Sequence, residues 1–224
     1  MIETSYKMKI LVFDTETTGL PEKRNTSILE TIKWPHIVQM SWILYDVDEK
    51  NILSCQDHII NCPVDIPEES TKIHGITKAR SLEKGVSIQF VLDLFDSDIQ
   101  KSDIIVAHNI SFDKRMCMVE AIRLRRKQYF TRGGIKHQEY CTMKETKEFC
   151  NIERASFKGT IYVKYPTLIE LHNKLFGFVP KGAHDSMADV LICMKCYLYF
   201  TKQNDIIKND TQICAMYDRY CVER

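Results

Sequence analysis

The sequence predicts an α/β domain built on a mixed β-sheet flanked by helices, and three features lead to this prediction. Residues 9–13 are a short, mostly apolar run, typical of a buried strand. Two longer β-rich runs follow, and after them segments with helical periodicity alternate with one more short apolar run. Consecutive strands followed by alternating helices and strands are typical of a mixed sheet covered by helices.

The first half of the chain divides into recognisable elements. The β-rich runs at 37–46 and 51–60 are separated only by VDEK, so they predict a β-hairpin. A short helix is expected to end at Gly75, and apolar residues at helical spacing predict a longer helix over 87–99. The run DIIVAH at 103–108 then predicts a short buried strand.

The second half is predicted to be mostly helical. A helix over 112–126 leaves the strand that ends near His108, and two more are expected at 167–177 and 185–203. The polar stretch 127–165 shows no periodicity that assigns it to a helix or a strand.

Composition indicates an ordinary water-soluble globular protein. The 224 residues are 44% hydrophobic and 27% charged, with a net charge of +1, so any nucleic-acid surface has to be local. We expect one domain over 1–224, with a core at 9–200 and a C-terminal extension at 203–224. No apolar run is long enough for a membrane span, and nine cysteines without an export signal indicate a reducing, cytoplasmic compartment, with the nucleus as an alternative.

Two acids stand at the end of the first predicted strand. Asp14 and Glu16 follow the apolar run in ILVFDTETTGL. Residues two apart on a strand face the same way, so the two carboxylates are expected to point toward one place and to repel each other. A positive group is therefore expected between them.

Other polar residues are expected at the same edge of the sheet. His108 and Asn109 follow the second buried strand, and the ends of strands in open α/β sheets are where sites gather. Asp113 lies in the first turn of the next helix, where the helix dipole alone is an alternative explanation for an acid. In AHDSMADV, His184 could be a loop residue, but Asp189 has apolar neighbours and should be paired or bind a metal.

Together these segments supply a set of oxygen ligands and one imidazole. Four carboxylates suit Mg²⁺ or Mn²⁺ better than zinc. Two such ions about 3.5–4 Å apart can stabilise the attacking and leaving oxygens of a phosphoryl displacement. Cations would also explain why two acids are tolerated at the end of a core strand.

Three segments in order, FDTETTGL, VAHNISFDKRM and AHDSMADV, resemble the three motifs of the DEDDh, or DnaQ-like, 3′–5′ exonucleases. The resemblance spans roughly residues 9–199 and implies a ribonuclease H-like fold. In the sister DEDDy branch a tyrosine lies four residues before the last acid. Asp185 occupies that position here and His184 precedes it, so the chain resembles the histidine type.

The resemblance also implies roles for the five motif residues. Asp14 would bind both ions, Glu16 and Asp189 the first ion, and Asp113 the second. His184 would be the general base that activates the attacking water, a task that suits an ordinary histidine pKa near about 6.5.

The family holds the terminal nucleotide with residues after the first acids and within the second motif. Carried over to this chain, the resemblance implies these substrate-binding residues: Thr17, Thr18, Leu20, His74, Asn109 and Phe112. Packing of its helix on the sheet is an equally good explanation for Phe112.

One concentrated basic stretch, residues 123–137, carries Tyr129 and Phe130 among its cations. It could follow a phosphate backbone or stack bases. The alternative is a solvated helix end, where cations favour the dipole.

The resemblance therefore implies a metal-dependent enzyme that removes nucleoside monophosphates from the 3′ ends of nucleic acid, with single-stranded or 3′-end nucleic acid as its partner. DNA is the expected substrate, as in proofreading and repair enzymes of this branch. An RNA-trimming enzyme is the closest alternative, and a catalytically inactive module that binds nucleic acid or a partner is another. A polymerase or other protein partner stays open.

Overall fold

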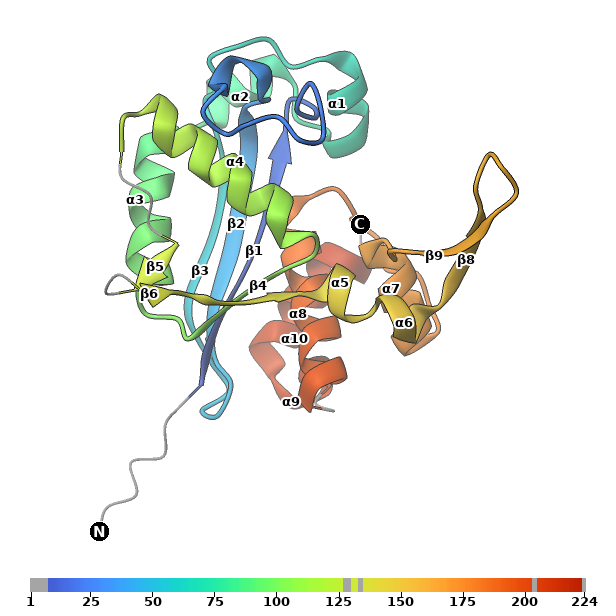
Figure 1. The fold of residues 1–224 in the computed structure, drawn as a ribbon. Coiled ribbons are helices and arrows are strands. Elements are labelled where there is room, and N and C mark those ends of the chain that lie inside the picture. The colour runs from blue at the N-terminus through green and yellow to red at the C-terminus, as the bar shows by residue number, and fades with distance from the viewer. Residues whose placement is uncertain (1–7, 127–129, 133–134, 203–204, 223–224) are drawn as a thin grey trace.

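The centre of the molecule is a five-stranded sheet, shown in Figure 1. The computed structural model describes residues 8–126, 130–132, 135–202 and 205–222. The strand order is β3-β2-β1-β4-β7, and β2 is antiparallel to both of its neighbours while β4 and β7 follow the direction of β1. The strands are β1 (Lys9–Thr17), β2 (Ile37–Asp46), β3 (Asn51–Ile59), β4 (Ile104–Ala107) and β7 (Gln138–Cys141). The predicted mixed sheet is confirmed.

Strand β1 is longer than the sequence predicted. It was expected to end at Phe13, but its pairing with β2 continues to Thr17, with Asp14 opposite Ser41 and Glu16 opposite Gln39. Backbone hydrogen bonds between strands do not require apolar side chains, so the strand extends beyond its apolar run. The two acids therefore sit within the sheet rather than in the loop that follows it.

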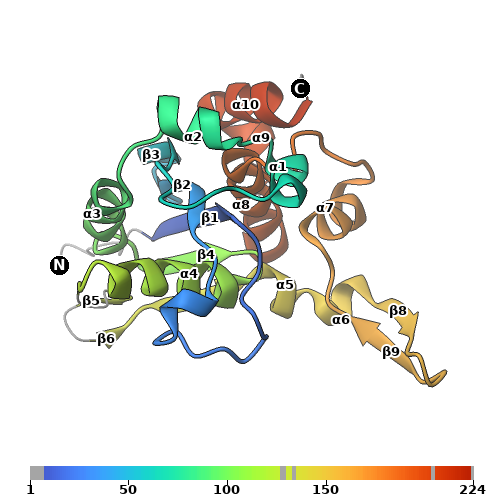
Figure 2. The same cartoon turned by 90° about the horizontal axis from the view of Figure 1, so that it is seen from above.

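Helices α3 (Ile88–Ile99) and α4 (Ile110–Arg123) cover one face of the sheet (Figures 1 and 2). Alternate side chains of β1, Leu11 and Phe13, are buried in the core between this face and the two helices. The ring of Phe13 packs 5.2 Å from the ring of Phe95, measured between centroids. This face is held by ordinary apolar packing.

The opposite face is covered by α7 (Leu168–Phe176), α8 (Ser186–Lys202) and α10 (Thr211–Tyr217). Ile10 and Val12 of β1 are buried there. Because side chains alternate along a strand, Asp14 and Glu16 continue the row that faces α8. The same face of β1 therefore carries core side chains in its first half and the two acids in its second half.

Smaller elements complete the fold. Residues 205–222 form α9 (Ile206–Asn209), α10 and a short π-helical turn, and their apolar side chains join the core around α8. The expected C-terminal extension is therefore packed against the body over its described part. None of the helices in the described residues combines the length and hydropathy needed to cross a bilayer.

The stretch that the sequence could not assign, 127–165, supplies the edge strand β7 and several short elements. These are β5 (Thr131–Arg132), β6 (Ile135–Lys136), α5 (Thr142–Glu145), α6 (Lys147–Cys150), β8 (Ile152–Ala155) and β9 (Ile161–Lys164). The β8–β9 hairpin projects away from the rest of the molecule in both views (Figures 1 and 2). Three short elements lie near the C-terminal end of β1, at the top of Figure 1: η1 (Thr31–Lys33), α1 (Glu68–His74) and α2 (Lys78–Lys84).

Candidate active site

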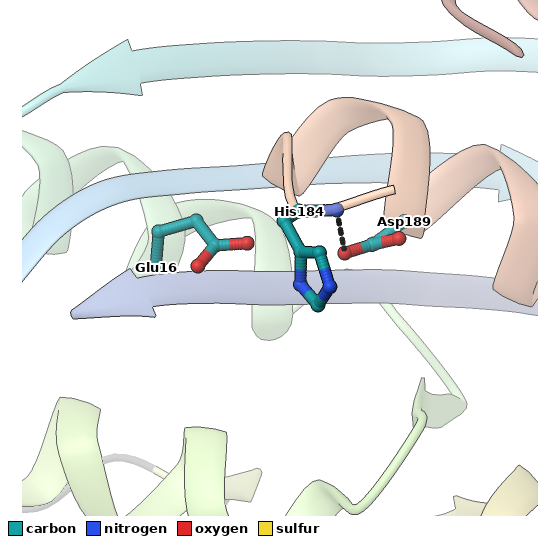
Figure 3. A group of neighbouring side chains, drawn as sticks. All are labelled: Glu16, His184 and Asp189. Atoms are coloured by element: carbon teal, nitrogen blue, oxygen red, sulfur yellow. Dashed lines mark hydrogen bonds between the residues drawn. The ribbon is translucent and has the colours of Figure 1, made fainter. Parts of the chain in front are cut away.

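Three of the predicted catalytic side chains meet at the C-terminal end of β1. One ligand atom each from Glu16, His184 and Asp189 lie within 4.8 Å of one another. Figure 3 shows the His184 ring between the two carboxylates, with Glu16 on the strand and Asp189 on the helix. Segments 168 residues apart in the chain therefore form one site, as the resemblance implied.

The position of His184 is set by the backbone before α8. Its φ is +71°, in the left-handed region that few residues other than glycine adopt. Its backbone N–H donates to Oδ2 of Asp189 over 3.1 Å, which ties the histidine to the first turn of α8 (Figure 3). The side chain of His184 itself is exposed. The imidazole is thus presented to solvent while its backbone is held.

Asp113 reaches the site from the other side of the sheet. It lies in the first turn of α4 and is only 3% exposed. Its Oδ1 accepts hydrogen bonds from the backbone N–H of Thr15 over 3.2 Å and from the Thr15 hydroxyl over 2.7 Å. A helix-start acid that only complements the dipole would be expected at the surface, so burial argues for a further role.

The four acids disturb one another strongly. Burial, followed by repulsion from Asp113, Asp189 and Glu16, raises the pKa of Asp14 well above its usual value. Burial and the neighbouring acids raise the pKa of Glu16 to about 9. Burial is also the main cause that raises the pKa values of Asp113 and Asp189, each to about 7. None of the main influences on these four groups is a cation of the described chain.

Such a cluster fits divalent cations. Buried carboxylates that lack a protein cation are stabilised when a metal ion supplies the positive charge. Four carboxylates offer the hard oxygen ligands that Mg²⁺ and Mn²⁺ prefer, and Glu16 and Asp189 already lie within reach of one ion. The donor set therefore fits a divalent-cation site, and a bound cation would lower the raised pKa values.

Asp185 is a fifth acid that the sequence interpretation did not include. It raises the pKa values of Asp14, Glu16 and Asp189. Its Oδ1 also accepts from the backbone N–H groups of Met187 at 3.2 Å and of Ala188 at 3.4 Å, at the start of α8. An aspartate directly before a helix is a recognisable N-terminal signal, and this residue combines that role with a negative charge at the site.

Two hydrogen bonds fix the start of α8 against β2, next to the acids. The backbone N–H of Ser186 donates to Oε1 of Gln39 over 3.3 Å, and the Ser186 hydroxyl bonds that of Ser41. Both partners lie opposite the two acids of β1 in the sheet. No sequence signal separates Gln39 and Ser41 from the other residues of their strand.

The predicted substrate-binding residues do not all lie together. Leu20, Asn109 and Phe112 line one cavity of about 590 Å³. His74 lines a second cavity, of about 360 Å³, together with His184. Phe112 is half-buried and packs against the core, which agrees with the packing role, and substrate binding by the same side chain stays a prediction.

The two threonines are engaged in the loop after β1. Thr17 is buried and its hydroxyl donates to the carbonyl of Gly19 over 2.7 Å. Thr18 accepts from the backbone N–H of His36 over 3.0 Å, and it borders a third cavity with Leu20. In this structure both side chains shape the loop.

The basic stretch is largely structural. Arg123 donates to the carbonyls of Thr31, Trp34 and Pro35, and Arg126 forms an ion pair with Asp93 over 2.7 Å. Phe130 is 4% exposed and belongs to the core beside α3. The interpretation as a nucleic-acid surface was wrong for Arg123, whose guanidinium is already engaged, and for Phe130, which is buried, and it stays a prediction for Arg126. Lys127 and Tyr129 lie outside the described residues.

Solved structures share this fold. E. coli Exonuclease I in complex with a dT13 oligonucleotide matches with a TM-score of 0.64 at 18% identity, covering 88% of this chain and 42% of that one. The zinc-bound form of the E. coli ExoI–ssDNA complex matches with a TM-score of 0.64 at 17% identity, covering 95% and 42%. An apo Exonuclease I gives a TM-score of 0.63 at 16% identity, covering 95% and 44%. This chain thus spans less than half the length of those proteins.

Curated protein sequences give no match to the chain. The family model described as Exonuclease, RNase_T, matches residues 11–197. This range contains all three motifs and every side chain of the acidic cluster. The chain belongs to this exonuclease family, with the ribonuclease H-like fold and the motifs of its DnaQ-like, DEDDh branch.

Proposed function

We propose that this chain is a metal-dependent 3′–5′ exonuclease that removes nucleoside monophosphates from the 3′ end of single-stranded DNA. The observation that carries the proposal is the meeting of Asp14, Glu16, Asp113 and Asp189 with an exposed histidine, His184, at one end of the sheet. Acids that only supported the fold would be expected to have cationic partners in the chain.

The proposed roles are those that the family resemblance implies, and the grouping of Glu16, His184 and Asp189 supports them. The four carboxylates would hold two divalent cations, Mg²⁺ or Mn²⁺, with Asp14 shared between them. When bound, such ions supply positive charge to the reacting phosphate and to the leaving oxygen. His184 accepts the proton of the attacking water at a ring nitrogen, for which an exposed imidazole beside two carboxylates is well placed.

The remaining residues orient the terminal nucleotide. Leu20, Asn109 and Phe112 share a cavity, and His74 borders the one that contains His184. In this proposal the terminal nucleotide contacts side chains that line these two cavities. The choice of DNA is supported by the dT13 bound to the structurally similar Exonuclease I.

Incubation with labelled oligonucleotides tests the proposal. A single-stranded DNA labelled at its 5′ end should be shortened stepwise from the 3′ end in Mg²⁺ or Mn²⁺, and excess chelator should abolish the reaction. RNA of the same sequence should be shortened more slowly. Faster loss of RNA would replace DNA by RNA as the substrate, and binding without hydrolysis in every metal would indicate an inactive module.

A further inference from the structure

The β8–β9 hairpin is unusual because it lacks a covering layer. Its strands are four residues each, and it projects from the body between α6 and α7 (Figures 1 and 2). An isolated two-stranded hairpin has little stability in water, since neither face has a hydrophobic core to join. A projecting hairpin therefore calls for an explanation outside the stability of the fold.

Large apolar side chains are exposed along this hairpin. Phe157 at its tip is fully exposed, and Ile161 and Tyr162 on β9 are 66% and 51% exposed. Tyr165, the residue directly after β9, is 44% exposed. Clustered exposed aromatic side chains on one element mark a binding surface more often than a solvated loop.

The outer part of the hairpin is also cationic. Arg154 lies directly opposite Tyr162 in the strand register, and Lys158 follows Phe157 at the tip. Neither cation forms an ion pair within the described residues, and Glu153 is the one acid of the two strands and their turn. Lys164 is different, because it is paired with Glu170 at the start of α7 over 2.7 Å. Unpaired cations beside exposed rings suit a phosphate backbone with unstacked bases.

The base of the hairpin reaches the cavity beside the acids. Tyr165 directly follows β9 and lines the same 590 Å³ cavity as Asn109 and Phe112. Lys144 and Arg24 are exposed cations on the same cavity wall. A strand whose last nucleotide occupies this cavity can therefore continue past Tyr165 onto the hairpin.

We propose that the β8–β9 hairpin is an arm that binds the single-stranded substrate on the 5′ side of its terminal nucleotide. Phe157 and Tyr162 would stack on bases, while Arg154 and Lys158 would contact phosphates. The inference rests on the proposed function for the identity of the strand. Nucleic acid is favoured over a protein partner because the arm joins the candidate active site through one cavity and carries unpaired positive charge.

A pair of matched double variants tests the arm. The arm variant is Phe157→Ala/Lys158→Gln, which removes one exposed apolar side chain and one cation from a hairpin. The control is Leu53→Ala/Lys50→Gln, which removes the same two kinds of side chain from the β2–β3 hairpin. All four residues are exposed, so both variants should melt with the wild-type protein.

Binding is measured by fluorescence anisotropy in chelator, with a labelled DNA of about 20 nucleotides, longer than a single-strand site of roughly 4–16. The arm variant should bind about 10-fold or more weakly, because one stacked base and one phosphate contact are lost. The slope of the logarithm of its binding constant against the logarithm of the salt concentration should become less steep by about 0.7, the value for one phosphate contact to a single strand. The control should match the wild type on both measures.

Hydrolysis of a trinucleotide, too short to reach the tip, is the second readout. Arm and control variants should cleave it at the wild-type rate in Mg²⁺. The proposed role of the arm is contradicted if both variants bind the long DNA with equal affinity. It is also contradicted if the arm variant loses as much activity on the trinucleotide as it loses affinity for the long DNA. If the wild type binds the long DNA without hydrolysing anything, the proposed function fails while the affinity comparison still decides the arm. A wild type that does not bind the DNA overturns the arm as well and leaves a protein partner for the hairpin.

Discussion

Two acids on helix α4 are buried equally and used differently. Asp113 and Glu120 lie seven residues apart on the same helix, and each is 3% exposed. Glu120 accepts from Arg123 over 2.8 Å and from the backbone N–H of Ile37 over 3.2 Å, and the ring of His36 lies 3.3 Å away. Its charge is matched by the chain itself.

Asp113 has no such cation among its main influences. Its hydrogen bonds come from Thr15, which is neutral, and burial raises its pKa to about 7. The same contrast extends to Asp14, which faces other acids, while Glu120 faces an arginine. Burial alone therefore does not point to a functional acid, whereas burial among like charges does, because the chain leaves the charge to be neutralised by a proton or by a bound cation.

The largest effect is expected from Asp14→Asn. If this carboxylate binds both cations, its loss weakens both together, and the rate should fall by about 10⁴-fold or more, the equivalent of about 5 kcal/mol of transition-state stabilisation. Single-turnover hydrolysis of a DNA oligonucleotide in saturating Mg²⁺ measures the loss. Glu120→Gln is the matched control, and its correctly folded fraction should cleave at the wild-type rate. A few-fold loss in Asp14→Asn would place the metal ligands elsewhere.

His184→Ala should have the next largest effect. A positioned general base contributes roughly 10²–10⁴-fold, so the single-turnover rate should fall by that factor while DNA affinity changes little. Because the His184 side chain is exposed, the melting temperature should stay near that of the wild type. A well-folded His184→Ala with a normal rate would mean that the histidine only shapes the loop. It would also remove the assignment of His184 as the general base of a DEDDh enzyme.

Glu120→Gln tests the structural side of the comparison. Removing one partner of a buried, hydrogen-bonded ion pair leaves Arg123 uncompensated, and such changes cost about 3–5 kcal/mol of stability. Asp113→Asn should instead stabilise the metal-free protein above about pH 7, because it removes an uncompensated negative charge. Urea denaturation of both variants in chelator measures the difference. Equal destabilisation would show that both acids are structural.

The sequence predicted the elements well and the pairing of charges poorly. The hairpin of β2 and β3, the helix ends at Gly75 and Gly177, and the three motifs follow from local pattern, which the chain carries in contiguous residues. Asp113 and Glu120 look alike in sequence because their difference lies in segments far along the chain. The partners of Glu120 include Ile37, 83 residues away, and those of Asp113 include Thr15, 98 residues away.

The prediction for Arg123 within the basic stretch was wrong for the same reason. Its place in a basic stretch suggested that Arg123 is a surface cation, but three carbonyls within residues 31–35 accept its hydrogen bonds. The arm was missed for a different reason: β8 and β9 are short strands in a polar stretch, and nothing in the sequence separates a projecting hairpin from an irregular loop. Asp185 was adjacent to a motif residue, yet its influence on three acids is visible only in three dimensions.

The smallest effect concerns the dependence of stability on pH and metal. Asp113 and Asp189 have folded pKa values of about 7, and Glu16 of about 9, all above their ordinary values of 3.8, 3.8 and 4.5. Between the ordinary and the raised values the folded state binds more protons than the unfolded chain, so this contribution to stability falls as pH rises. The metal-free protein should therefore lose stability as the pH rises from about 4 to about 7 through Asp113 and Asp189, and up to about 9 through Glu16, and this loss should level off above those values.

Mg²⁺ should reverse this loss, because it supplies the charge that the chain does not. At 100 times its dissociation constant, a ligand that binds only the folded state adds about 2.7 kcal/mol, or roughly 5–10 °C in melting temperature for a chain of this size. The gain should be larger at pH 8 than at pH 5, where protons compete for the same carboxylates. Asp14→Asn should lose most of the gain and Glu120→Gln should keep it, which differential scanning fluorimetry at the two pH values can measure. A Mg²⁺ effect that is absent at pH 8, or equal in both variants, would separate the acidic cluster from metal binding, since the Glu120 ion pair is already neutral without an ion.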